Sequence, residues 1–299
     1  MIKTYTSASD IDFSVDELPS LPRPGRVLMT KPTHFDVKYV INPHMADHVG
    51  EVDRQEAGRQ WRVVKDAYES LGFTVNLVEG REDLEDMVFC ANQTLPYYSP
   101  SDGEHGVVLG NMHAPQRREE VQHFERYFRS IGYDVLHISG DGVLDFEGMG
   151  DAIWHPRTHL LWGGYGIRTS REAYSQISEQ LDVRVLLLRL EDEEFYHLDT
   201  CFSTLDKSSV LIFPGAFDEM GLGLIHHFFE RVIEAPEEEA RNLLACNCHC
   251  PDGERVIIQK GCDTTNRLLR DAGFEPMEVD TSEFLKAGGS VFCMKQMFW

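Results

Sequence analysis

The stretch that decides the fold is LGFTVNLV at residues 71–78, because the same pattern recurs as IGYDVLHI at 131–138 and AGFEPMEV at 272–279. In each copy a glycine follows a segment with helix-like spacing of apolar residues, and an aromatic residue then leads into an apolar run. Glycine at this place is a helix-stop signal, because it adopts the left-handed backbone conformation without strain. Each stretch therefore predicts the end of a helix and the start of a strand.

Working outward from these stretches, helix-like spacing of apolar residues is found in five segments, at roughly 50–71, 116–131, 170–181, 220–233 and 263–272. Short β-branched or aromatic runs separate them, so the chain alternates β and α. A roughly even period predicts one supersecondary unit that is used about five times around a common core. An ordinary doubly wound sheet is the alternative α/β fold.

The ends of the domain are predicted from composition. Residues 1–24 finish in LPSLPRP and show little periodicity, so we interpret them as an N-terminal tail or outer strap, followed by a single domain over residues 25–299. No apolar run approaches the roughly 20 residues that a bilayer crossing needs. The first residues also lack the basic and then apolar order of a secretory signal. We therefore expect a soluble, cytoplasmic protein.

The net charge of the chain restricts the classes of molecule that it is expected to bind. Fifty acidic residues against 28 basic ones give a formal charge of −22, spread along the whole sequence. Such a surface disfavours nucleic acid and anionic membrane as partners. It is typical of a solvated acidic coat and would also favour a small cationic substrate. No GxGxxG or GxxxxGK[ST] motif follows a strand, so we expect neither a nucleotide nor another cofactor.

The seven cysteines of the chain are an odd number, and without a secretory signal they are expected to be reduced thiols. CNCHC at 246–250 suggests zinc, but a strand there would place its three cysteines on one face and His249 on the other. A second ligand pair at zinc spacing is missing. We therefore predict buried thiols and no metal.

Three other segments carry groups suited to catalysis. FEGMGDAIW (146–154) has two carboxylates among glycines before an apolar strand, YHLDTCF (196–202) has a histidine and an aspartate on one face of an expected strand, and LKAGGSVFCMK (285–295) has a cysteine after a Gly-rich turn. Each alone is more typical of a structural role. Together they supply a nucleophile, a base and carboxylates that orient the base and hold a cation, as Cys–His covalent catalysis requires. The residues concerned are Glu147, Asp151, His197, Asp199 and Cys293.

These segments, taken in order, resemble the guanidino-group-modifying superfamily, which includes arginine deiminases, dimethylarginine hydrolases, amidinotransferases and bacterial arginine dihydrolases. The resemblance covers about residues 27–297. Besides the three segments above, it is carried by MTKPTHFDVKYVINPHM (29–45), EDMVFCANQTL (85–95), GGYGIRTS (163–170) and FPGAF (213–217). The arginine dihydrolase branch is the most similar, in INP, F-x-AN, GYG-x-R and HLDTCF. The fold that this implies is a five-bladed αβ propeller, or pentein, of pseudo-symmetric ββαβ units.

The resemblance also implies roles. Cys293 would attack the guanidinium carbon and form a thiouronium intermediate, and His197 would protonate the leaving group and then activate water. Glu147 would hydrogen-bond the imidazole, and Asp199 would hold an edge of the guanidinium. Asn42 of the INP segment is a further expected substrate contact.

Two positions depart from the usual pattern. Asn92 stands where deiminases and methylarginine hydrolases carry an aspartate, as in the dihydrolase branch, which takes arginine through bound citrulline to ornithine. Asn111 stands where relatives that bind free amino acids have an arginine for the substrate carboxylate, and it is an expected substrate contact, with Arg117 and Arg118 following later. Arg168 still matches a carboxylate-binding position. The departures favour a hydrolase that breaks two C–N bonds, and they leave substrates other than free arginine open.

Two alternatives stay open. An amidinotransferase would use the same thiouronium and let an amine replace water. A non-catalytic binding protein on the same fold, as in a related translation initiation factor, is disfavoured because all three catalytic residue types are present. A homo-oligomer is also compatible with the sequence.

Overall fold

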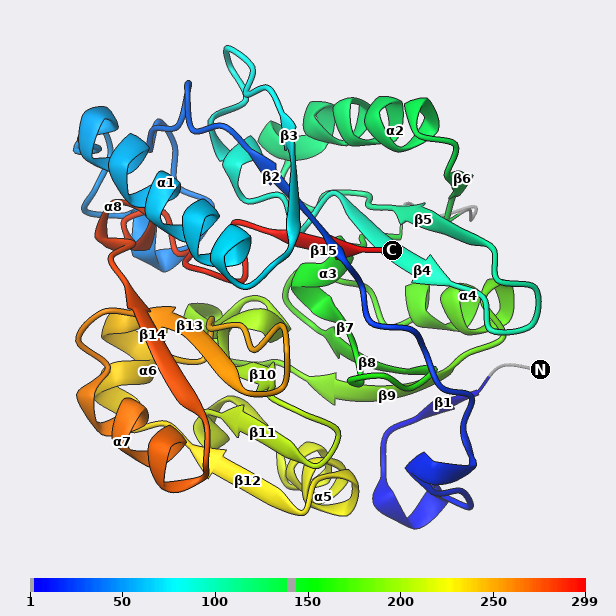
Figure 1. Ribbon diagram of the computed structural model, residues 1–299. Coiled ribbons are helices and arrows are strands. Elements are labelled where there is room, and N and C mark those ends of the chain that lie inside the picture. Colours follow the sequence, from blue (N-terminus) through cyan, green and yellow to red (C-terminus); the bar gives the residue numbers. More distant parts are fainter. Residues whose placement is uncertain (1–2, 139–143) are drawn as a thin grey trace.

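Five separate small sheets make up the computed structural model, which describes residues 3–138 and 144–299 as a mixed α/β fold (Figure 1). In these residues the strands do not join into one open sheet, so the doubly wound alternative is wrong. The sheets contain, in spatial order, β15 (Gln296–Phe298), β2 (Arg26–Thr30) and β3 (Thr74–Val78); β4 (Thr94–Tyr98), β5 (His105–Leu109) and β6 (Asp134–Leu136); β1 (Thr4–Tyr5), β9 (Arg184–Arg189), β8 (Leu160–Tyr165) and β7 (Ala152–Trp154); β10 (Phe202–Thr204), β11 (Ser209–Ile212) and β12 (Arg231–Glu234); and β13 (Arg255–Gln259) with β14 (Glu275–Val279).

The same connection recurs in every sheet. In four of them an antiparallel pair is followed by a parallel pair, as with β4, β5 and β6, and the fifth sheet retains the parallel pair β13 and β14. A parallel pair needs a crossover connection, and a helix supplies it each time. The crossover helices are α1 (Arg54–Ser70), α2 (Val121–Ser130), α4 (Ala173–Gln180), α5 (Glu219–Phe228) and α7 (Asp263–Asp271).

The glycines of the three recurring stretches end their helices as predicted. Gly72, Gly132 and Gly273 have φ of 84°, 83° and 93°, in the region that L side chains rarely adopt. After α4 the same place is taken by Asp182, with φ of 47°. This repeat lacks the glycine signal in the sequence because an aspartate occupies the left-handed position.

The predicted helical segments are largely confirmed, with one correction. The segment 220–233 is helical only to the end of α5, because β12 begins at Arg231 and pairs parallel with β11. The residues Val232 and Ile233 therefore belong to a strand and not to the helix. Three short α-helices complete the α-helices of the described residues: α3 (Gly148–Asp151), α6 (Glu237–Leu243) and α8 (Ser282–Leu285).

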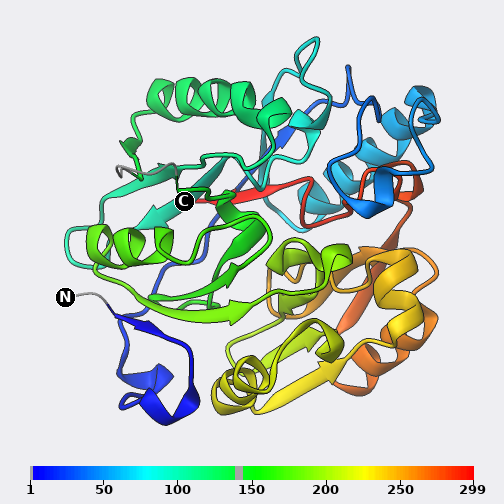
Figure 2. The ribbon, with the colours of Figure 1, turned by 180° about the vertical axis from the view of Figure 1, so that it is seen from behind.

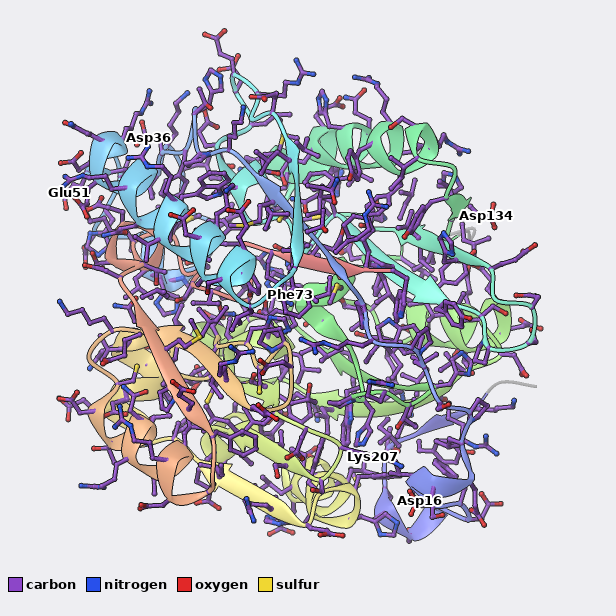
Figure 3. The ribbon with its side chains drawn as sticks, in the orientation of Figure 1. Asp16, Asp36, Glu51, Phe73, Asp134 and Lys207 are labelled. Carbon is purple, nitrogen blue, oxygen red and sulfur yellow. The ribbon has the colours of Figure 1, made fainter. Side chains whose placement is uncertain are left out.

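The N-terminal segment lies against the outside of the sheets. β1 pairs parallel with β9, Leu21 is buried, and Lys207 reaches Asp16 at 2.6 Å (Figure 3). Residues 1–2 lie outside the described residues. At the other end β15 pairs with β2, so the last strand closes the first sheet (Figure 2). In the described residues no helix is long and apolar enough to cross a membrane.

Candidate active site

Cys293 lies just before β15, with 3% of its surface exposed. Its thiol donates to Asp199 Oδ2 at 3.2 Å and accepts from Asn247 Nδ2 at 3.2 Å. Burial, together with the negative charge of Asp199, raises the pKa of the Cys293 thiol well above its ordinary value. The resting Cys293 side chain is therefore a protonated thiol, rather than the pre-formed thiolate of a Cys–His ion pair.

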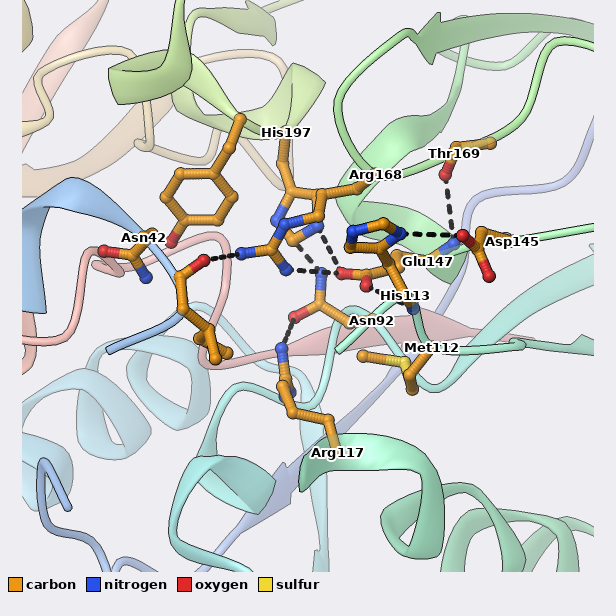
Figure 4. Close-up of polar contacts among 12 residues, drawn as sticks. Asn42, Asn92, Met112, His113, Arg117, Asp145, Glu147, Arg168, Thr169 and His197 are labelled. Carbon is orange, nitrogen blue, oxygen red and sulfur yellow. Dashed lines mark hydrogen bonds and ion pairs between the residues drawn. The ribbon is translucent and has the colours of Figure 1, made fainter. Parts of the chain in front are cut away.

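His197 and Glu147 form a buried pair. The imidazole Nε2 lies 2.5 Å from Glu147 Oε2, and Arg168 Nη1 donates to the same oxygen at 3.3 Å (Figure 4). Burial alone would raise the pKa of Glu147, but the charge and hydrogen bond of His197 and the charge of Arg168 outweigh it and lower the pKa below its ordinary range. Glu147 is therefore ionised and fixes the Nε2–H tautomer of His197.

Asp151 connects the two segments that carry this pair. Its Oδ1 accepts from Leu198 N at 3.0 Å and its Oδ2 from the Thr169 hydroxyl at 2.6 Å. Residues Leu198–Thr200 form a short 3₁₀ helix, with His197 at its N-cap position, so the expected strand at 196–202 is wrong. A tight turn is favoured because Thr200 Oγ1 donates back to His197 O at 2.6 Å. The turn, rather than strand alternation, brings His197 and Asp199 to one site.

Asn92 lies beside the histidine. Its Nδ2 is 3.5 Å from His197 Nδ1, and its Oδ1 accepts from Arg117 Nη1 at 3.0 Å. Gly150 faces this amide so closely that a Cβ there would lie 2.2 Å from Asn92 Nδ2. Glycine at that position is therefore required by the close approach of Asn92, since Gly150 does not have a positive φ.

Asn42 and Arg168, the two other predicted substrate contacts, line a small cavity at the site, which has room for about one water molecule. Asn42 donates from Nδ2 to Ala287 O at 3.1 Å, and Arg168 donates from Nη2 to Ile41 O at 2.7 Å with its guanidinium over the Tyr196 ring. The cavity is lined by Asn42, Asn92, Arg168, His197 and Cys293, among others. The structure thus brings together these five residues from segments far apart in the sequence.

Asn111 is not among the residues lining this cavity. Its Nδ2 donates to Leu144 O at 2.9 Å, and its backbone forms an isolated bridge with Phe146. Asn111 therefore shapes the segment that leads to Glu147, and its predicted substrate contact stays a prediction.

The CNCHC segment is not the strand that was expected. Only His249 makes a bridge, to Ile257, and all three cysteines are buried free thiols. In the part of the chain that the structure describes, no three His, Cys, Asp or Glu side chains gather as metal ligands would. The segment instead contributes Asn247, whose amide contacts Cys293.

Sequence reasoning missed three residues of the site: Asn247, Arg117 as the partner of Asn92, and Asp86. Asp86 lines the cavity and accepts from the Tyr39 hydroxyl at 2.9 Å. Burial raises its pKa. Asp86 could have been found from the sequence, because it lies in the segment EDMVFCANQ, six residues before Asn92. Asn247 was overlooked because the cysteines on either side of it suggested a zinc site.

With this geometry in place, comparison with known proteins gives the family. The family model described as eukaryotic N,N dimethylarginine dimethylhydrolase matches residues 32–298. The N(G),N(G)-dimethylarginine dimethylaminohydrolase of Mycobacterium tuberculosis is 34% identical over 91% of this chain and 85% of its own length. The chain belongs to the dimethylarginine hydrolase family.

Members of the guanidino-modifying superfamily with a second activity are also similar. The bifunctional arginine dihydrolase/ornithine cyclodeaminase AgrE of Nostoc is 37% identical over 90% of this chain, which spans only 37% of that protein's length. The N-terminal domain of ArgZ, an arginine dihydrolase from cyanobacteria solved with its substrate, superposes with a TM-score of 0.83 at 34% identity, covering 91% of this chain and 97% of that domain. The predicted superfamily is thus confirmed.

Proposed function

We propose that this protein hydrolyses the C–N bonds of a linear guanidine of the arginine type, with Cys293 as nucleophile, His197 as acid and base, and Glu147 as the partner of His197. The observation that carries the proposal is the meeting of the Cys293–Asp199 contact and the His197–Glu147 pair at one buried cavity. A thiol, an imidazole and carboxylates in this arrangement are what displacement at a guanidinium carbon needs.

Unpartnered acceptor oxygens support a cationic substrate. Among the residues that the structure describes, Asp199 Oδ1, Asn42 Oδ1 and Asp86 Oδ1 are buried without a hydrogen-bond partner. Leaving a buried acceptor unsatisfied is costly, so such atoms indicate a donor that arrives from outside. Guanidinium and ammonium groups carry several N–H donors and suit these oxygens. We assign Asp199 to the guanidinium, and Asp86 with Asn42 to the far end of the substrate.

The first displacement follows from these contacts. The thiol proton passes to Asp199 Oδ2 along the existing hydrogen bond, and the sulfur electron pair forms the S–C bond to the guanidinium carbon. As the C–N bond breaks, protonated His197 gives its proton to the leaving nitrogen, so ammonia or an amine departs and a thiouronium stays on Cys293. Glu147 balances the imidazolium charge before that transfer.

In the hydrolysis of the thiouronium, His197 acts as a base instead of an acid. Neutral His197 takes a proton from water, hydroxide adds to the thiouronium carbon, and the C–S bond breaks to return the thiol and release a ureido product. In a dihydrolase the ureido group stays and a second displacement with water releases the other ammonia, leaving a carbamate on the ornithine nitrogen. The carbamate then loses carbon dioxide, so arginine and two waters give ornithine, carbon dioxide and two ammonia molecules. The Asn92 amide faces His197 with an N–H group, and such a donor suits a neutral ureido oxygen as well as a leaving nitrogen.

The cavity has room for about one water molecule, so side chains must shift when a guanidino group enters. Arg168 lines the cavity and is the residue we expect to move, leaving the Tyr196 ring and Glu147 as it does so. Turned outward, it would meet a substrate carboxylate.

The proposed function is tested by the products. The protein is incubated with arginine, citrulline, N(G),N(G)-dimethylarginine and agmatine, with and without glycine as acceptor amine, and products are identified by mass spectrometry while ammonia is counted. Two ammonia molecules per arginine with ornithine would support the dihydrolase form, and one with citrulline the simple hydrolase. Ornithine formed only with the acceptor would favour the amidinotransferase, and no product from any of the four would overturn the proposal.

Three further assignments are proposals of the same kind. Five sheets with one recurring connection support a five-bladed propeller in which each sheet is a blade. Seven free cysteines support a reducing, cytoplasmic compartment. We expect a small guanidino compound as the main partner and leave a homo-oligomer to solution measurement.

A further inference from the structure

Asn247 is a fully buried polar residue in the loop after α6, between two cysteines. The loop turns sharply there, since Leu244 adopts the left-handed conformation with φ of 47° and accepts from Asn247 N at 2.8 Å. A left-handed conformation is unfavourable for a leucine, so the surrounding structure must hold this turn in place. What the turn achieves is the placement of the Asn247 side chain.

The acceptor groups of Asn247 hold the segment that carries the nucleophile. Its Oδ1 accepts from Ser290 N at 3.0 Å and from Cys293 N at 3.3 Å, and its backbone oxygen accepts from Phe292 N at 2.9 Å. Three backbone N–H groups of the turn before β15 are thereby satisfied by a single residue. The turn is thus bound to a segment more than forty positions away in the chain.

The donor end of the same amide faces the reacting sulfur. Nδ2 donates to Asp199 O at 2.9 Å and to Cys293 Sγ at 3.2 Å. The amide cannot turn over, because its oxygen would then meet the Asp199 carbonyl and its NH₂ group would meet two N–H donors. The network therefore fixes an N–H group on Sγ.

We propose that Asn247 is a further catalytic residue, whose side-chain N–H stabilises the Cys293 thiolate while its carbonyl oxygen holds the turn that carries the nucleophile. The inference rests on the proposed function for the meaning of the thiolate. When the thiol proton passes to Asp199 Oδ2, the negative charge moves to Sγ and the net charge of the site is unchanged. The Nδ2–H bond is then charge-assisted and stronger than in the resting state, so it favours the reactive form.

Other groups around the sulfur do not replace this contact. Asp199 raises the pKa of the thiol, and Tyr196 and Lys295 act on Cys293 only through charge. Among the described side chains, Asn247 is the one that donates to Sγ, while Asp199 accepts from it. A backbone hydrogen bond from Ser290 also lowers the pKa of the thiol, but its effect is smaller than that of Asn247. A donor to the ionised form lowers a pKa, so its removal raises the pKa of Cys293 further.

The test separates the two halves of the amide. Asn247→Asp keeps an oxygen for the N–H groups of the turn but removes the donor on sulfur, whereas Asn247→Ala removes both. Alkylation of Cys293 by 2-chloroacetamidine and by neutral iodoacetamide is followed against pH. We expect Asn247→Asp to keep a cooperative thermal transition and to label about 10-fold or more slowly at pH 7, with its apparent thiol pKa shifted upward. In turnover, kcat should fall by a similar factor with KM little changed.

Matched controls use residues outside the site. Asn266→Ala truncates another buried asparagine, on α7, and Cys248→Ala changes a neighbour in the same loop. Both should label with the parent's pH profile. Parent-like labelling of Asn247→Asp and Asn247→Ala would overturn the inference.

A measurement on the parent covers the case in which neither variant folds. The side-chain ¹⁵N resonance of Asn247 should titrate with the midpoint of Cys293 labelling and should stop titrating in Cys293→Ser. A resonance that does not move would contradict the inference. Labelling needs no substrate, so the two proposals can fail separately. If the Asn247 variants label more slowly as expected but the parent turns over no guanidine, the role of Asn247 beside the thiolate stands and the proposed function is overturned.

Discussion

Arg117 donates from Nη1 to Asn92 Oδ1 at 3.0 Å, and both side chains are buried. The arginine is itself held by Glu120 and by two backbone carbonyls, so it cannot follow a change at Asn92. With the oxygen of the amide occupied, the NH₂ group of Asn92 is the end that faces His197. Asn92 therefore presents a donor to the reaction centre.

The first prediction concerns this amide. Asn92→Asp places a carboxylate against Arg117 and removes the N–H group beside His197, so a neutral ureido group loses a donor. We expect the variant to bind arginine and release one ammonia, accumulating citrulline, while the parent releases two and forms ornithine. Ammonia counting with mass spectrometry measures this. The control is Asn76→Asp on β3, which adds the same charge beside Arg26 of β2, away from the site. A parent that leaves citrulline untouched would contradict the dihydrolase form.

The repeats could be predicted because they depend on local signals. Gly72, Gly132 and Gly273 end their helices through their own backbone freedom, whereas Asp182 performs the same turn under strain that surrounding packing must offset. In the sequence, apolar residues after α5 fitted a helix as well as a strand, and only pairing with β11 decides between them. Local pattern thus located the units but not all of their boundaries.

The site divides in the same way. Cys293, His197 and Glu147 are predicted because their residue types match a chemistry, and their roles stay predictions. The cavity that Cys293 and His197 line also brings in Asn42, Asn92 and Arg168. The role of Asn247 depends on contacts with positions 199, 290 and 293, and nothing local records such contacts. Its hydrogen bonds exist only after the sheets have packed.

The nucleophile gives the second prediction. Cys293→Ser should fold and bind substrate with no measurable turnover, because a serine hydroxyl beside Asp199 is far harder to deprotonate than a thiol. Steady-state kinetics and intact-mass detection of the covalent adduct measure this. Cys250→Ala is the matched control, since that buried thiol lies in a different loop. Activity within about tenfold of the parent would remove Cys293 from the covalent step.

The buried acid–base pair gives the third prediction. His197→Ala and Glu147→Gln should each lower kcat by about 10²–10⁴-fold, because proton transfer to the leaving nitrogen and from water depends on the imidazole and its charged partner. His113→Ala tests specificity, since that side chain is exposed and pairs with Asp145 instead; it should change kcat little. An unchanged kcat with altered KM in the first two variants would place both residues in binding.

The last prediction concerns Lys295, which is fully buried and whose Nζ has no hydrogen-bond partner among the described residues. Burial lowers the pKa of Lys295 to about 7, against a tendency of Asp199 and nearby thiols to raise it. Between about pH 7 and 10 the unfolded chain therefore binds a proton that the folded chain does not, and the stability of the parent rises with pH across that window.

Lys295→Met keeps the length of the side chain over the Phe292 ring and removes the amine, so it should be more stable than the parent near pH 7. The difference in unfolding free energy should shrink by about 1 kcal/mol per pH unit as pH rises toward 10, because only the parent gains stability there. Denaturant titration at several pH values measures the difference, and the titration of Asp199, centred near pH 7, lies at the lower edge of the window. The exposed Lys260→Met is the control and should show a constant difference. A constant difference in Lys295→Met as well would mean that the buried amine keeps its proton, held by a charge that compensates for burial.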